Sequence, residues 1–485
     1  MSEPWQPLRR IVVVGDGPLG VLTAIALKQA LPPAQLVVVG TPPDAASFAD
    51  RSSTALPFAN RLHDSLGIGE EALVRRCGAS HRLVTRYVGT LAGGEGVAGY
   101  GAEVDPKLNT GFARNWGSGP RNASTAPAPG SLGEALAASG RFAPLPPDPG
   151  SPLAAIDYAL RWNVPAYRDL LIGIAHGLGV QHGRGSVTAI EPDGHGGAAT
   201  VSVEGGRPLT ADLFVDCSGA GAALLSRLAG ARWIDWGDRL PARSIVFAKP
   251  GPPMLSLEDR LTLTEAGWRW DIAGRDGRMA LLALAEGKGE QAARLALGGE
   301  PAETAPIAPR CAAEPWLGNV VALGDAAAWL EPTGGFALDL AHRQLQLLLE
   351  LLPGRGVHPL ERAEFNRRAR LMAEQARDAL AAHYACPAAA GVYGGPDVSP
   401  DLDLVLDQWT RRGRVPFLEE SPLLTQEWAS LLHALGFPAA EGTLARAEGQ
   451  RQADARARAF AGEVAAALRS APPYDEWMNR ALAGQ

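Results

Sequence analysis

Residues 9–32 read RRIVVVGDGPLGVLTAIALKQALP, and this stretch decides the fold. An apolar run (IVVV) is followed by a glycine-rich turn and about four turns of residues with helical apolar spacing. A second apolar run, AQLVVVG, follows at 34–40. The order predicts a strand, a helix and a second strand. Strands without polar alternation are typical of a parallel sheet covered on both faces, so we expect an α/β fold.

The turn contains the pattern G-x-G-x-x-G, formed by Gly15, Gly17 and Gly20 with Pro18 and Leu19 between them. Between a strand and a helix, such glycines allow a tight turn, close approach of backbone N–H groups to a pyrophosphate, and close packing of helix on strand. We predict that these five residues bind a dinucleotide. A purely structural turn is the alternative.

One part of the dinucleotide pattern is missing. The second strand normally ends in an acidic residue that binds the adenosine ribose, but Gly40 and Thr41 stand at that position. The sequence therefore leaves open how tightly a dinucleotide binds.

A second turn is predicted in the segment 318–327, GNVVALGDAA, where an apolar strand leads to Gly324 and Asp325. In flavoproteins of this layout such an aspartate accepts hydrogen bonds from the ribityl chain, and the following helix N-terminus stabilises the reduced ring. We predict that Gly324, Asp325, Gly334 and Gly335 bind FAD. The alternative is that Asp325 only caps a helix.

A third segment, ADLFVDCSG at 211–219, resembles the strand that precedes the flavin site in such proteins. On this basis Ser218 and Gly219 are predicted to approach the cofactor. An ordinary buried strand is the alternative interpretation.

The length of the chain indicates more than one lobe, because 485 residues exceed what one hydrophobic core usually supports. The predicted fold is a Rossmann or glutathione-reductase type FAD-binding sheet with an inserted antiparallel lobe for the substrate and a helical C-terminal region. The predicted domains are an FAD-binding domain (1–118 with 153–230 and 310–350), a proline- and glycine-rich connection (119–152), an antiparallel lobe (231–309) and a helical domain (351–485).

Charge and cysteine usage exclude several classes of partner. The net charge of −7 comes from interspersed acidic and basic residues, which argues against nucleic acid or a membrane surface and favours a small-molecule substrate. The four cysteines form no C-x-x-C pattern, so neither a metal site nor a disulfide framework is predicted. We expect a reduced, cytoplasmic setting without a signal peptide or membrane span. A homodimer is compatible with the sequence.

Together these motifs make the chain similar to the flavin-dependent tryptophan halogenase family, within the FAD-dependent halogenase and monooxygenase superfamily. The resemblance extends to the segments 66–89, 365–384 and 425–438. It implies that FAD is reduced by a separate flavin reductase and forms a hydroperoxide with oxygen, which oxidises halide.

The stretch GWRWDIA, Gly267–Ala273, is similar to the family's tryptophan-tryptophan-isoleucine-proline signature, with Ala273 in place of the proline. The resemblance implies that Trp268 and Trp270 lie at the substrate side of the site. The alternative is that both are core residues of a strand.

Three positions depart from the family. The family's lysine is replaced by Arg82, and its glutamate and threonine, counted from Glu331-Pro332, fall on Gly334 and Phe336. Arginine keeps its proton near neutral pH and does not readily form a haloamine.

We therefore predict an FAD-dependent monooxygenase that acts through the flavin hydroperoxide on an aromatic or electron-rich small molecule. Arg82 is expected to bind a substrate carboxylate or phenolate, His81 is a candidate acid or base, and Phe336 is expected to contact the substrate. Trp116, Trp162 and Trp329 are candidates for an aromatic pocket, with core packing as the alternative. A diverged halogenase and a halogenase-like, non-catalytic flavin-binding protein remain open.

Overall fold

The computed structural model describes residues 6–40, 42–92, 94–101, 130–144, 150–154, 156–440 and 450–484. The chain forms two compact units, and each is assembled from three separate segments. Unit 1 comprises Met1–Gly78, Trp162–Ile245 and Glu303–Arg377, and unit 2 comprises Ala79–Arg161, Val246–Ala302 and Asp378–Gln485. The chain thus passes from unit 1 to unit 2 within the predicted segment 1–118.

The centre of unit 1 is a six-stranded sheet in the order β18-β19-β10-β1-β2-β7. Its strands are β1 (Arg10–Val14), β2 (Gln35–Gly40), β7 (Gln181–Arg184), β10 (Leu213–Asp216), β18 (Trp316–Leu317) and β19 (Val320–Ala322). All neighbours run parallel except β18 and β19. The parallel α/β sheet predicted from the sequence is confirmed.

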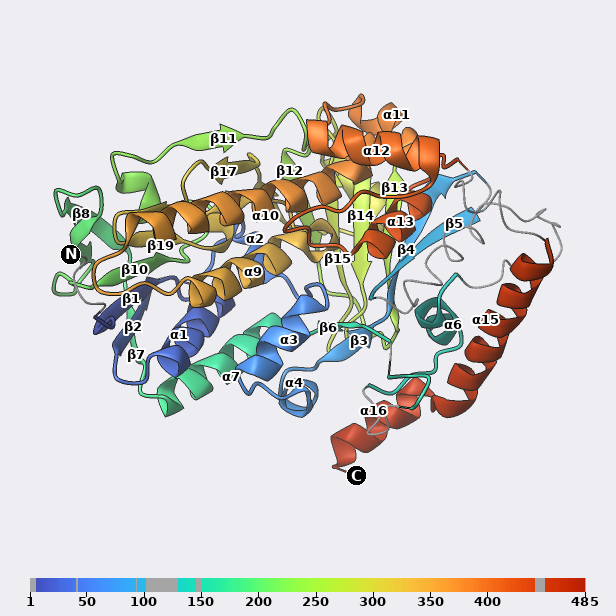
Figure 1. Ribbon diagram of the computed structural model, residues 1–485, viewed down its shortest axis with the longest axis horizontal. Coiled ribbons are helices and arrows are strands. Elements are labelled where there is room, and N and C mark those ends of the chain that lie inside the picture. The colour runs from blue at the N-terminus through green and yellow to red at the C-terminus, as the bar shows by residue number, and fades with distance from the viewer. Residues whose placement is uncertain are drawn as a thin grey trace. The chain divides into compact units, whose positions relative to one another are not determined.

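Helices cover this sheet. Helix α1 (Pro18–Ala30) packs against α7 (Val164–Gly177) and α9 (Phe336–Glu350) (Figure 1). Residues Pro18–Leu27 of α1 are buried without interruption, which explains why its sequence lacks a polar face. The other elements of unit 1 are α2 (Phe48–Arg51), α3 (Phe58–Ser65), α4 (Glu70–Arg76), β8 (Val187–Pro192), β9 (Ala198–Val203), β11 (Trp233–Asp235), β17 (Arg310–Ala312) and β20 (Ala328–Trp329).

Unit 2 contains most of a seven-stranded sheet in the order β16-β12-β15-β14-β13-β4-β5, and the chain passes between the two units within β12 and β16. The strands of this sheet are β4 (Val84–Leu91), β5 (Gly94–Gly99), β12 (Ser244–Ala248), β13 (Glu258–Thr264), β14 (Gly267–Ile272), β15 (Met279–Leu284) and β16 (Pro301–Pro306). The pairs β4–β5, β13–β14 and β14–β15 are antiparallel, whereas β4 and β13 are parallel. The predicted antiparallel lobe therefore exists, and β4 and β5 from the N-terminal part of the chain complete it.

Two short strands, β3 (Ser80–Arg82) and β6 (Ala159–Arg161), pair separately in unit 2. The helices are α6 (Leu132–Ala138), α8 (Glu290–Leu297), α11 (Ala390–Tyr393), α12 (Pro400–Arg412), α13 (Thr425–Ala434), α15 (Gln450–Ser470) and α16 (Tyr474–Ala483), and α10 (Pro359–Ala385) begins in unit 1 and ends in unit 2. The helical C-terminal region is as predicted. Composition alone did not predict α6, which lies inside the predicted connection 119–152.

No helix in the described ranges is long and apolar enough to cross a membrane. All four cysteines are buried and unbridged. The cytoplasmic location inferred from the sequence stays a prediction.

Candidate functional site

The carboxyl ends of the parallel strands in unit 1 bring the predicted cofactor segments to one edge of the sheet. Gly15 follows β1, Cys217 follows β10, and Gly324 follows β19 after one intervening residue. Ligands of open α/β sheets bind at this edge. Gly15 and Gly324, which are more than 300 positions apart in the sequence, thus contribute to one candidate site.

Two of the three fingerprint glycines serve the packing of the turn itself. Gly15 has φ +141°, and a Cβ there would lie less than 3.0 Å from the backbone oxygen of Cys217. A Cβ at Gly20 would overlap the backbone oxygen of Gly15 in the same way. Gly15 and Gly20 therefore allow β1, β10 and α1 to approach closely, as predicted from the sequence.

Gly17 is different, because the space beside it is filled by a carboxylate. A Cβ at Gly17 would lie less than 3.0 Å from all three carboxyl atoms of Asp50, a residue of α2. Asp50 Oδ1 accepts a hydrogen bond of 2.8 Å from the backbone N–H of Leu19, in the first turn of α1. A carboxylate of the chain itself thus takes the place at the helix N-terminus where an anionic ligand would bind.

Burial raises the pKa of Asp50 to about 7, and the nearby charge of Asp16 adds to the increase. The hydrogen bond from Leu19 and the positive charge of Arg168 act in the opposite direction. Near neutral pH the carboxyl group therefore exists in both protonation states.

Asp16, inside the fingerprint, is fully engaged by two basic side chains. Its carboxylate lies 2.6 Å from Arg168 Nη2 and 2.5 Å from His182 Nε2, and its backbone oxygen accepts a further hydrogen bond of 2.6 Å from Arg168 Nε. Arg168 is thus already paired with a carboxylate and is not an independent partner for a phosphate.

A cavity of ≈ 180 Å³ opens beside the turn. Of the described residues that line it, Asp16, Asp44 and Asp50 are acidic, and Arg227 is basic. The Arg227 guanidinium donates to the backbone oxygens of Ala223 and Val187. An acidic lining of this kind is unfavourable for a pyrophosphate.

The Ser218 hydroxyl makes hydrogen bonds within its own loop. Its hydroxyl lies 2.5 Å from Asp216 Oδ1 and accepts a hydrogen bond of 2.6 Å from the N–H of Ala223. Gly219 has φ +82°, and a Cβ there would lie less than 3.0 Å from Ser47 Oγ. Both residues lie at the predicted edge of the sheet, and Ser218 and Cys217 also line the cavity.

The second predicted turn has the properties expected of a flavin-binding aspartate. Asp325 is buried, and its Oδ2 accepts a hydrogen bond of 2.9 Å from the N–H of Ala49. Its Oδ1 has no hydrogen-bond partner within the described part of the chain. Burial raises the pKa of Asp325 well above its usual range. An enclosed acceptor oxygen of this kind suits a hydroxyl donor such as a ribityl group.

Gly334 and Gly335 lie directly before α9, with φ +74° and +86°. These left-handed conformations favour glycine and let the chain turn sharply into the helix. A Cβ at Gly334 would lie less than 3.0 Å from the ring of Phe336, so this ring covers the space of a side chain at position 334. The two positions at which the resemblance places a glutamate and a threonine are therefore packed against each other.

The site residues assigned to FAD thus fit the cofactor at one end only. At the flavin end, Asp325 and the start of α9 offer an unused acceptor and a helix N-terminus. At the pyrophosphate end, Asp50 occupies the turn, and β2 ends in Gly40 without a carboxylate for the ribose. With Asp50 in this position, the glycine turn does not fit a pyrophosphate.

Arg82 and His81 lie in unit 2 and are completely buried. Arg82 Nη1 lies 3.1 Å from Asp259 Oδ2, and Arg161 Nη1 lies 3.1 Å from Asp259 Oδ1. The Arg82 guanidinium also lies over the rings of Tyr100 and Trp270, at 5.4 and 5.8 Å from their centroids. Desolvation acts to lower the pKa of Arg82, but the interactions with Tyr100 and with the carboxylate of Asp259 outweigh it and raise the pKa overall.

The His81 ring is surrounded by four aromatic side chains. It makes edge contacts with Phe142, Tyr158, Tyr474 and Trp477, and its Nδ1 lies 2.8 Å from the Tyr474 hydroxyl. The same hydroxyl accepts a hydrogen bond from the His81 N–H. The acid or base role of His81 stays a prediction, and in this conformation its ring is part of an aromatic core.

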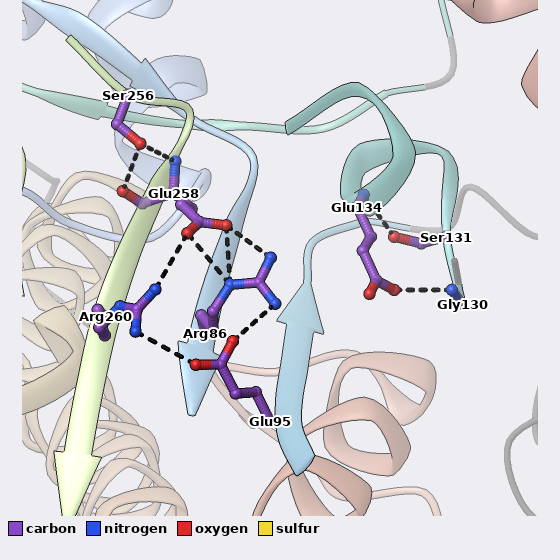
Figure 2. Close-up of polar contacts among 8 residues, drawn as sticks. All are labelled: Arg86, Glu95, Gly130, Ser131, Glu134, Ser256, Glu258 and Arg260. Atoms are coloured by element: carbon purple, nitrogen blue, oxygen red, sulfur yellow. Dashed lines mark hydrogen bonds and ion pairs between the residues drawn. The ribbon is translucent and has the colours of Figure 1, made fainter. Parts of the chain in front are cut away.

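A different, more exposed ion network lies beside this core in unit 2. Figure 2 shows Arg86 and Arg260 joined to Glu95 and Glu258 on three neighbouring strands. Glu134 caps the start of α6 nearby, accepting from the N–H of Gly130. Glu95 and Glu258 are each paired with guanidinium groups, so we interpret this network as one that stabilises the sheet.

The aromatic candidates are buried as well. Trp268 donates from Nε1 to the His383 oxygen at 3.1 Å, and Trp270 packs beneath Arg82. In unit 1, Trp162 packs against Tyr167, and Trp329 stacks on Phe48. Trp116 lies outside the described residues. Substrate contact by Trp268, Trp270 and Phe336 stays a prediction.

Sequence reasoning missed Asp50 and Asp259, the two carboxylates that fill the predicted sites. Neither belongs to a local motif: Asp50 lies in a four-residue helix, and Asp259 near the start of β13. A search for acidic residues near the fingerprint and near Arg82 would require tertiary structure.

A parallel sheet with a glycine turn at one strand end and a buried aspartate at another, accompanied by a large antiparallel sheet, is typical of FAD-dependent oxidoreductases. Within that class the chain belongs to the tryptophan halogenase family, whose sequence model matches residues 10–448. This family is flavin-dependent and uses FAD that a separate reductase reduces.

Two characterised relatives are tryptophan 7-halogenases. RebH of Lentzea aerocolonigenes is 24% identical over 409 residues, which cover 77% of this chain and 76% of RebH. KtzQ of Kutzneria sp. (strain 744) is 26% identical over 407 residues, which cover 78% of this chain and 76% of KtzQ.

Solved structures show the same fold over nearly the whole chain. BrvH, a flavin-dependent halogenase from Brevundimonas sp. BAL3, has a TM-score of 0.85 at 23% identity, covering 98% of this chain and 99% of BrvH. Xcc4156, a flavin-dependent halogenase from Xanthomonas campestris, has a TM-score of 0.86 at 22% identity, covering 98% of each chain. The predicted family and fold are thereby confirmed.

Proposed function

We propose that this chain is an FAD-dependent monooxygenase that acts on an aromatic or electron-rich small molecule without using halide. Reduced FAD comes from a separate flavin reductase, as in the family. When bound, reduced FAD supplies the activation of molecular oxygen.

The observation that carries the proposal is the enclosure of Arg82. The resemblance places this residue at the family's lysine position, where an amine would capture or orient the oxidised halogen. Here the guanidinium is ion-paired with Asp259 and has no solvent exposure. Arginine also keeps its proton at any pH at which the protein is folded. The side chain thus offers neither the chemistry nor the access of that lysine.

The glutamate and threonine positions support the same conclusion. Gly334 has no side chain to activate an electrophile, and the Phe336 ring fills the adjacent space. Loss of all three side chains argues against halogenation more strongly than the loss of one.

The residues for holding the flavin remain. Asp325 has a buried acceptor oxygen. Helix α9 begins directly after Gly334 and Gly335, the two glycines with left-handed conformations that were predicted to bind FAD. The positive end of α9 would favour an anionic reduced ring, and Asp325 would accept from the ribityl hydroxyls. Retention of these groups supports a flavin function over a purely structural one.

The test supplies reduced FAD, oxygen and bromide with a panel of indoles, phenols and pyrroles, and identifies products by mass. We expect a product that has gained oxygen and carries no bromine isotope pattern. Asp325→Ala serves as the control and should abolish the oxygenated product. A brominated product from the unchanged protein would overturn the proposal and favour a diverged halogenase.

A second function, that of a halogenase-like, non-catalytic flavin-binding protein, is favoured by the position of Asp50 at the pyrophosphate end. Flavin absorbance of the purified protein, measured with and without added FAD, tests whether the chain binds FAD. FAD binding without any product across the panel would favour the non-catalytic function. No binding at high micromolar FAD would exclude both.

A further inference from the structure

Helix α2 (Phe48–Arg51) contacts both ends of the candidate FAD site through two consecutive residues. Asp50 accepts the hydrogen bond of Leu19 N–H at 2.8 Å, and Ala49 N–H donates to Asp325 at 2.9 Å. We propose that α2 is an internal plug, in which the Asp50 carboxylate stands in for the pyrophosphate and FAD enters only when α2 is displaced. This inference rests on FAD binding under the proposed function.

The space beside Gly17 is the place where Asp50 and a pyrophosphate would overlap. In a dinucleotide turn, the missing side chain of the middle glycine leaves room for the pyrophosphate to approach the backbone. In this chain the same room holds the carboxyl group of Asp50, because every carboxyl atom lies within 3.0 Å of a Cβ placed on Gly17. A pyrophosphate and Asp50 cannot both occupy this position.

The charged and titratable groups near Asp50 are mostly acidic. Asp16 from the fingerprint turn, Asp325 from the β19 turn and the Cys217 thiol after β10 all interact electrostatically with Asp50, and Arg168 from α7 is the basic group that opposes them. Arg168 is itself paired with Asp16. An ionised Asp50 would therefore repel a pyrophosphate that no free cation in this set attracts.

Several contacts hold α2 in place. Phe48 stacks on Trp329 with ring centroids 6.2 Å apart, Arg51 Nη2 lies 2.6 Å from Glu303, and Trp329 Nε1 donates to the Ala46 oxygen at 3.0 Å. These contacts all lie within unit 1. Displacement of α2 would release Leu19 N–H for the pyrophosphate and the second oxygen of Asp325 for the ribityl chain together. Both ends of the site would open in one movement.

The experiment measures equilibrium binding of oxidised FAD to the full chain by flavin fluorescence. Asp50→Gly removes both the charge and the bulk, whereas Asp50→Asn removes the charge and keeps the size and the acceptor for Leu19. Asp64→Asn is the matched control, because Asp64 is an exposed carboxylate on α3 of the same unit that does not line the cavity.

We expect Asp50→Gly to bind FAD about tenfold or more tightly than the unchanged protein, since it removes both the bulk and the like charge from the pyrophosphate position. Asp50→Asn keeps the bulk of the plug and should not bind FAD more tightly than the unchanged protein, and Asp64→Asn should stay within about twofold. Binding to the unchanged protein should strengthen as pH rises from about 4 to about 7, because ionisation of the buried Asp50 destabilises the plugged state, and this dependence should be reduced in Asp50→Asn.

Equal affinity of the unchanged protein and Asp50→Gly would overturn the plug and leave the proposed function intact. Absence of FAD binding in every variant would overturn the plug and the proposed function together. If Asp50→Gly does not fold, as judged by circular dichroism, Asp50→Asn and the pH dependence decide. An Asn variant with the pH dependence of the unchanged protein would contradict the plug.

Discussion

Asp259 Oδ2 accepts from Arg82 Nη1 at 3.1 Å, and neither side chain has any solvent exposure. The other carboxylate oxygen accepts from Arg161 at 3.1 Å and from the N–H of Ala273 at 3.1 Å. One buried carboxylate is thus shared by two buried guanidinium groups. The position that the family resemblance assigns to chemistry is, in this chain, a structural ion pair.

The first prediction concerns stability. Asp259→Asn should lower the free energy of unfolding by about 3–5 kcal/mol, because it removes the negative charge that two buried guanidinium groups share. Urea denaturation followed by circular dichroism measures the change. Glu258→Gln, at the adjacent position in the partly exposed network of Figure 2, is the control and should cost about 1 kcal/mol or less. Equal losses in both variants would contradict the buried triad.

A second prediction concerns the lysine position. Arg82→Lys should not produce halogenation, because the side chain stays enclosed beside Asp259 and the positions Gly334 and Phe336 are unchanged. Products formed with bromide, reduced FAD and oxygen are checked by mass for the bromine isotope pattern. Arg86→Lys is the control for a general effect of the substitution. Bromination in Arg82→Lys alone would show that the lost lysine is sufficient to explain the lost activity.

A third prediction uses the pKa of Asp50, which is about 7 in the folded chain against an ordinary value of 3.8. Since the folded state binds the proton more tightly, the free energy of unfolding should fall as pH rises from about 4 to about 7, by roughly 4 kcal/mol. Asp50→Asn should remove this decrease and be the more stable protein at about pH 8.

Thermal and urea unfolding across that pH range measure the difference between the two curves. Burial lowers the pKa of His63 to about 4 and that of His342 to about 3, so these histidines make the protein less stable as pH falls below about 6.5. Their contribution is common to both curves and cancels in the difference. Parallel curves would show that Asp50 is not buried against the turn.

A fourth prediction locates the Asp50 carboxylate without FAD. Gly17 has φ −87° and ψ 174°, a conformation open to any residue, so the cost of Gly17→Ala comes from overlap with Asp50. We expect a loss of about 1–3 kcal/mol in the unchanged background and a clearly smaller loss when Asp50→Gly is also present.

Gly69→Ala is the matched control for this cycle. Gly69 also caps the start of a helix, with φ −64°, and a Cβ there would meet nothing within 4 Å. The general cost of alanine at such a cap is therefore common to both substitutions. Additive losses for Gly17→Ala and Asp50→Gly would contradict contact between the two residues.

The parts of the fold that local patterns determine could be predicted from the sequence. The run Arg10–Val14 and the glycines after it predict β1, the turn and α1, because burial on both faces leaves no polar alternation. The strands around Trp268 and the C-terminal helices were predicted for the same kind of reason.

The state of the site could not be predicted in this way. Asp50 reaches Leu19 across 31 positions, and Asp259 reaches Arg82 across 177. Both contacts depend on how separate elements pack, and no periodicity or spacing records that packing. The resemblance identified the positions of the lost lysine, glutamate and threonine, but the burial of Arg82 depends on its contacts with Asp259, Tyr100 and Trp270 from other strands and loops.

The interleaving of the two units has a consequence for synthesis on the ribosome. The His81 N–H donates to the hydroxyl of Tyr474, which is translated 393 positions later, and unit 1 requires residues up to Arg377. The nascent chain therefore has to keep the apolar strands β1 and β2 from aggregating until most of the polypeptide has emerged. Both cores can therefore be completed only late in synthesis.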